Sequence, residues 1–129
     1  WEIYERKAAE YSQPVNRNSW SMAGPMHLAN SKEDAMNNVR FGLNEWVSYF
    51  RDEAALTLVP EGEDPAEALV ASGLAVIGTP DDAIAQIRRL EEASGGFGAF
   101  LQMAHNWADW NETKLSYELF ARHVAPEFQ

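Results

Sequence analysis

The stretch from Gly96 to Asp109 constrains the fold of this chain more than any other segment. It begins with a glycine-led apolar run, ends in polar and aromatic residues, and is followed at once by a helix start. An unbroken apolar run of this length is typical of a parallel strand that is covered on both faces. The polar residues then lie just beyond the carboxyl end of that strand, where α/β folds bind their ligands. We therefore predict an α/β fold with a buried strand here.

The composition supports one folded domain and narrows the classes of partner. With 129 residues and 46% hydrophobic content, the chain is long enough to bury a core. Its net charge of −10 repels phosphate backbones and anionic membranes, so we expect neither nucleic acid nor a membrane as partner. Because the chain has no cysteine, disulfides and thiolate metal sites are excluded, and a cytoplasmic location is favoured. No stretch has transmembrane length, and no signal peptide is visible.

The first 30 residues predict a helix followed by an extended segment. The chain opens at Trp1 with an amphipathic helix over residues 1–12 that is already in progress, so we expect a piece of a longer protein. After a loop, residues 20–29 have an extended pattern. Pro25 has no N–H to donate to a strand ladder, which predicts an edge strand, or a strand interrupted at Gly24 and Pro25.

The strongest helix pattern spans residues 32–55. It starts with a capping box at Ser31. Apolar side chains then recur at spacings of three and four, at Met36, Val39, Leu43, Trp46 and Phe50. Core packing explains this stripe better than a cofactor site does.

The rest of the chain predicts a short helix and an apolar segment, followed by two longer helices on either side of the strand from Gly96. In chain order we expect a solvated acidic loop at 60–65, a short helix at 66–72, an apolar segment at 74–78, a helix starting at Thr79 and ending at Gly95, the strand from Gly96, and a helix from 110 to about 124 that Pro126 ends.

Two histidines and one tryptophan are the candidates for a functional site. His27 and His105 each lie at or near the end of a predicted strand, where histidine can donate a proton or anchor a hydrogen bond; a buried structural role is the alternative for each. Trp107 can stack on a flat ligand ring or cover the rim of a barrel. His123, in the last turn of a helix, is better explained by a structural role. No histidine has metal-ligand spacing, so we predict no metal site, and no motif identifies a catalytic residue.

Several passages, in order, also resemble one protein family. They are Trp20–Ser31, Val39–Leu43, Trp46–Phe50, Ile77–Asp82, Ser94–Gly98, His105–Ala108 and Ser116–Arg122. Together they are similar to the luciferase-like flavin-dependent monooxygenases, in the branch that includes limonene and alkane monooxygenases. The resemblance covers nearly the whole chain. It departs at Asn30, where the family leads us to expect an acidic residue.

The resemblance implies that residues 1–129 are the C-terminal part of a luciferase-like (β/α)8 TIM barrel, a fragment that is mostly helical with few strands. The implied activity is that of a monooxygenase that uses reduced FMN and O2 to oxygenate a hydrophobic small molecule, with a separate flavin reductase as partner. Most flavin contacts are expected on earlier strands. The catalytic residues therefore stay unassigned, and His27, His105 and Trp107 remain candidates for the flavin or substrate pocket.

Two alternatives to this function remain open, and the isolated fragment is expected to behave differently from the whole protein. The same barrel family also includes oxidoreductases that transfer hydride with the deazaflavin F420, and a non-enzymatic helical interaction domain is the third hypothesis. Taken alone, these residues leave sheet edges and apolar faces without cover. We therefore expect an inactive fragment that self-associates into a homo-oligomer, with His105 and Trp107 facing solvent or a second copy.

Overall fold

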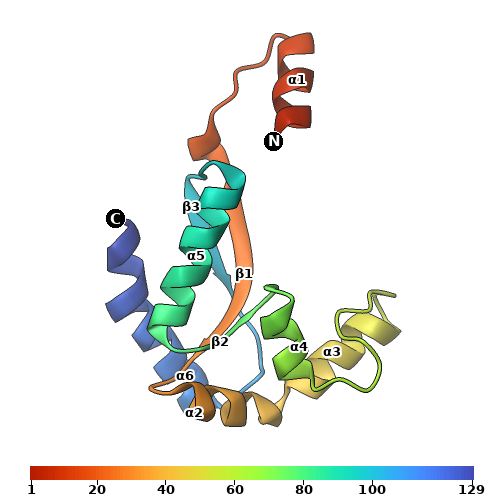
Figure 1. Cartoon of the computed structure of the whole chain (residues 1–129), viewed down its shortest axis with the longest axis vertical. Coiled ribbons are helices and arrows are strands. Elements are labelled where there is room, and N and C mark those ends of the chain that lie inside the picture. The colour runs from red at the N-terminus through yellow and green to blue at the C-terminus, as the bar shows by residue number, and fades with distance from the viewer.

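The computed structural model describes residues 1–129 as helices arranged around a three-stranded parallel sheet (Figure 1). The predicted α/β class, mostly helical with few strands, is confirmed. The elements in chain order are α1 Glu2–Glu10, a 3₁₀ turn Arg17–Ser19, β1 Ser21–Leu28, α2 Lys32–Asn38, a 3₁₀ turn Val39–Phe41, α3 Leu43–Asp52, α4 Pro65–Ala71, β2 Val76–Gly78, α5 Pro80–Ser94, β3 Ala99–Met103, α6 Trp110–Leu119, a π-helical turn Phe120–Val124 and a 3₁₀ turn Ala125–Phe128.

The strand order is β2-β1-β3, so β1 is the central strand and the prediction of an edge strand is wrong. Its ladder with β3 ends at Pro25, and its ladder with β2 begins at Met26. Alternate residues of a strand direct their backbone polar groups to opposite sides. Ala29 N donates to Gly78 O of β2 at 2.9 Å, so position 25 also faces the β2 side, but before β2 begins. The missing N–H of Pro25 therefore costs no ladder bond.

The strand β3 is an edge strand with one open face, so the prediction of a strand covered on both faces is wrong. Its residues alternate between exposed and half-buried, and the side chains of Leu101 and Met103 are 56% and 42% exposed. It pairs only with β1, and the face that contains these two residues is exposed. The apolar run indicated a strand correctly but not its surroundings.

Two groups of buried side chains form the core. One group lies between the sheet, α5 and the C-terminal turns, and consists of Met26, Leu28, Val76, Ala83, Ile87 and Val124. The other joins α2, α3 and α4 to the end of the sheet, and consists of Ala29, Ala35, Val39, Leu43, Val47, Ala66, Leu69, Ala75, Ile77 and Trp107. In Figure 1, α5 lies along the sheet, while α2, α3 and α4 gather near the carboxyl end of β1.

The helix predicted over residues 32–55 is broken into α2 and α3 at Gly42. The N–H of Gly42 donates to the carbonyl of Trp107 at 2.9 Å. A Cβ at position 42 would overlap the carbonyl oxygen of Asn106, so only glycine allows the two backbones to approach this closely. The apolar stripe continues through the break, which explains why it predicted one helix.

Three further observations concern the rest of the chain. The apolar segment at 74–78 contains the short strand β2. The last helix, α6 with its π-helical turn, ends at Val124 as predicted, and a 3₁₀ turn follows to Phe128, because proline fits the first positions of such a turn. The helix α1 was predicted, and it lies apart from the sheet on an extended linker (Figure 1). None of the helices is long and apolar enough to span a bilayer.

Candidate functional site

The three candidate residues meet at the carboxyl end of β1 and β3. His27 comes from the end of β1, and His105 and Trp107 come from the segment that follows β3. The ring centroids of His27 and His105 are 6.0 Å apart. The ring of His105 stacks on that of Trp107 at 4.2 Å, with an angle of 20° between the planes. The fold thus brings together residues that are up to 80 positions apart in the sequence.

Both ring nitrogens of His105 have partners within the chain. Its Nε2 lies 2.9 Å from the carbonyl oxygen of Met26, and its Nδ1 accepts from the backbone N–H of Trp107 at 3.3 Å. A carbonyl only accepts hydrogen bonds, so this pattern requires the neutral tautomer with its proton on Nε2. Burial lowers the pKa of His105, while the bond to Met26 opposes that change.

His27 is in the opposite situation. Its side chain has no solvent exposure, and neither ring nitrogen has a hydrogen-bond partner within the chain. Burial, together with the nearby His105, lowers the pKa of His27 from 6.5 to about 4. The imidazole is therefore neutral at pH 7, with one donor and one acceptor unused.

Trp107 is fully buried, and the expectation that it faces solvent or a second copy is wrong. Its indole packs edge-on against Trp46 of α3, with 5.1 Å between the ring centroids. The bond from Gly42 holds its backbone against the junction of α2 and α3. In this structure Trp107 covers the end of the sheet, while His105, in the same segment, is half-buried.

One residue of this region escaped the sequence reasoning. The side chain of Gln102 donates from Nε2 to the carbonyl of Met26 at 3.2 Å, so this oxygen accepts hydrogen bonds from two side chains. Gln102 is the only polar residue in the apolar run from Gly96 to Met103, and that exception was the signal that could have identified it. The partner, a backbone carbonyl 76 positions away, leaves no signal in the sequence.

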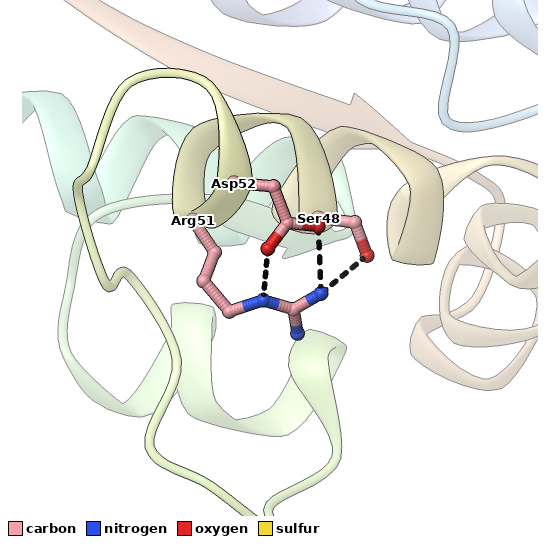
Figure 2. Close-up of polar contacts among 3 residues, drawn as sticks. All are labelled: Ser48, Arg51 and Asp52. Carbon is pink, nitrogen blue, oxygen red and sulfur yellow. Dashed lines mark hydrogen bonds and ion pairs between the residues drawn. The ribbon is translucent and has the colours of Figure 1, made fainter.

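A second polar cluster lies on α3, away from these residues. Arg51 donates from Nε and Nη2 to the two carboxylate oxygens of Asp52 at 2.7 and 3.0 Å, and also approaches Ser48 Oγ at 3.4 Å (Figure 2). This pairing raises the pKa of Arg51 and lowers that of Asp52. Arg51 also lines a cavity of about 660 Å³ between α3 and the acidic loop. Its charge is already neutralised by an exposed partner, so we do not treat this cavity as the candidate site.

No three acidic or histidine side chains gather closely enough to hold a metal ion. His123 is exposed in the π-helical turn, apart from the candidate site.

The sequence is similar to those of several monooxygenases. It is 42% identical to limonene 1,2-monooxygenase of Rhodococcus erythropolis, over 99% of this chain and 33% of that protein. It is 34% identical to 4-hydroxyprotoasukamycin monooxygenase of Streptomyces nodosus subsp. asukaensis, over 99% of this chain and 35% of that protein. The chain is a homologue of these monooxygenases. The resemblance inferred from the sequence is confirmed, and the chain spans about a third of the length of these relatives.

Solved structures show the same arrangement of elements. The type II Baeyer-Villiger monooxygenase that is the oxygenating constituent of 3,6-diketocamphane monooxygenase from Pseudomonas putida, solved in complex with FMN, matches 100% of this chain and 39% of its own, with a TM-score of 0.69 and 23% identity. A monooxygenase of Streptomyces bottropensis matches 99% of this chain and 36% of its own, with the same TM-score and identity. No protein-family model matches the chain.

Proposed function

We propose that this chain is the C-terminal part of a (β/α)8 barrel monooxygenase that uses reduced FMN and O2 to oxygenate a hydrophobic small molecule. The observation that supports this best is the 42% identity to a limonene monooxygenase along 99% of the chain. The parallel sheet, with its candidate residues at the carboxyl end, agrees with the position of active sites in such barrels.

The residues near His27 fit an uncharged ring. By strand register and alternation, Ala23, Leu101 and Met103 share the face of the sheet that contains His27. These side chains are small or apolar, and no acidic or basic side chain bonds to His27. We therefore assign to this face the ring of the flavin or the apolar substrate, and we assign the phosphate contacts to the portion of the parent protein beyond these residues.

The chemistry divides between cofactor and protein. Reduced FMN, when bound, supplies the electrons that activate O2, and we propose that a separate flavin reductase provides it in this form. The chain contributes by excluding water at the end of the sheet, where Trp107 and the helices α2 and α3 close the core. The remainder of the parent covers the open face.

The two alternatives have weaker support. Oxidoreductases that use F420 belong to the same barrel family, but a structural neighbour of this chain is described in complex with FMN. A non-enzymatic helical domain does not explain why relatives that are 34% and 42% identical are both named monooxygenases.

The decisive experiment uses the longest natural reading frame that contains this sequence. We expect it to convert limonene to an oxygenated product when FMN, NADH and a flavin reductase are supplied in air. The 129-residue chain is the matched control and should give no product. Turnover that needs F420 and proceeds without O2 would contradict the proposal, and so would stoichiometric micromolar binding of FMN by the 129-residue chain.

A further inference from the structure

The peptide unit between Met26 and His27 is held by two side chains from the neighbouring strand and its extension. The carbonyl oxygen of Met26 accepts from Gln102 Nε2 at 3.2 Å and from His105 Nε2 at 2.9 Å. A carbonyl oxygen has two lone pairs, so its accepting capacity is filled. Because this carbonyl belongs to the same peptide plane as the nitrogen of His27, the two bonds fix the direction from which the His27 side chain departs.

The imidazole that is held in this way has no partner of its own. A buried polar group without a hydrogen bond destabilises the fold, and native proteins keep few such groups. His27 has two such nitrogens and is fully buried, whereas His105, only half-buried, has both nitrogens bonded. His105 therefore supports the backbone, whereas His27 is left free to bind another molecule.

We propose that His27 contacts the bound molecule directly, offering a neutral imidazole to an uncharged carbonyl or hydroxyl oxygen, and that Gln102 and His105 are positioning residues that hold it. This inference rests on the proposed function only in placing a ligand on this face of the sheet. An anionic group does not fit, because the neutral imidazole and the net charge of −10 give it no compensating cation. The uncharged oxygen can belong to a substrate or to the flavin ring.

The test follows the histidine ring nitrogens of the 129-residue chain by NMR, with ¹⁵N-labelled histidine at pH 7. Cyclohexanone represents a substrate with an uncharged oxygen, and lumiflavin represents the flavin ring without phosphate. Methylcyclohexane and cyclohexanecarboxylate are the apolar and anionic controls, and exposed His123 is the internal reference. We expect cyclohexanone or lumiflavin to move the His27 ring signals, whichever is the source of the oxygen, while both controls leave them in place.

Variants separate contact from positioning. We expect His27→Phe to reduce the affinity for cyclohexanone to that for methylcyclohexane. We expect His105→Leu and Gln102→Leu each to weaken it by roughly five- to tenfold, as the loss of one net hydrogen bond does. His105→Gln keeps a donor and should restore most of the affinity, and His123→Gln should change nothing. The wild-type spectrum should also show His105 with its proton on Nε2.

The outcomes that overturn the inference are distinct from those that overturn the proposed function. If neither cyclohexanone nor lumiflavin moves the His27 signals, or if the carboxylate moves them more, His27 is not the contact. If both leucine variants bind as the wild type does, Gln102 and His105 do not position it. Turnover by the longer protein that needs F420 and proceeds without O2 would reject the monooxygenase and leave these spectra unaffected.

Discussion

The two halves of β1 have opposite surroundings. The amino half, Ser21–Gly24, pairs with β3 and is exposed or half-buried, whereas Met26, His27 and Leu28 in the carboxyl half are at most 1% exposed. The carboxyl half has β2 beside it and adjoins both groups of core side chains, one through Met26 and Leu28 and the other through Ile77, while one face of the amino half has no cover. The only histidine of the strand lies in the half that is more buried. Burial along this strand is therefore set by neighbours that are distant in the sequence.

The largest expected effect comes from removing the cover of the buried half. Trp107→Ala should lower the free energy of unfolding by about 3–5 kcal/mol, because a fully buried indole leaves a cavity that the core cannot refill. Trp110→Ala is the matched control; this side chain is 78% exposed, and its loss should cost less than about 0.5 kcal/mol. Urea unfolding followed by circular dichroism measures both. Equal losses would mean that Trp107 does not cover the buried half as described.

A matched pair of leucines tests the contrast directly. Leu28→Ala in the buried half should destabilise the chain by about 2–5 kcal/mol, because the side chain has no exposure. Leu101→Ala on the open face should cost well under about 1 kcal/mol, because this side chain is 56% exposed. The measurement is the same urea titration at two protein concentrations. A loss at Leu101 that grows with concentration would show that a second copy covers the open face.

The buried histidine predicts a loss of stability in acid. The pKa of His27 is 6.5 in the unfolded chain and about 4 in the folded one. Above pH 6.5 both states are neutral; between pH 6.5 and 4 only the unfolded state binds the proton, so stability falls as the pH falls. From pH 7 to pH 5 the expected loss is about 2 kcal/mol from His27, and His105 adds to it in the same direction.

The control for this pH dependence is a pair of histidine variants. His27→Gln should flatten the fall in unfolding free energy between pH 7 and pH 5, whereas His123→Gln, at an exposed position, should leave its slope unchanged. A slope that survives in His27→Gln would assign the acid sensitivity to other groups.

The smallest effect concerns the helix that begins directly after the candidate site. The carboxylate of Asp109 accepts from the N–H groups of Asn111 and Glu112 at 2.9 and 3.1 Å and caps α6. Asp109→Ala should cost about 1 kcal/mol, as is usual for the loss of such a cap. Asp52→Ala is the control: it removes an exposed ion pair and should give no measurable change. Thermal unfolding of the two variants side by side distinguishes them.

Features that depend on neighbouring residues were predictable. The start of α5 is one example, because Thr79 and Asp82 form a capping box, and its end is another, because Gly95 adopts a φ of 76°. Both signals lie within a single helical turn of the boundary that they determine. Likewise, His27 and His105 were identified as candidates from their positions after strand-like runs.

Features that depend on contacts between distant segments were not predictable from pattern. The break at Gly42 exists because the backbone of residues 106–107 packs against it, and the central position of β1 follows from partners 50 and 78 residues further along. The chain's own residues determined its helices, its class and its homology to monooxygenases. Only the tertiary structure decided which face of the sheet stays open, that Trp107 is buried, and that His27 has free nitrogens while His105 does not. Caps and periodicity act within a few residues, whereas burial and hydrogen-bond satisfaction are set by whatever the whole fold brings alongside.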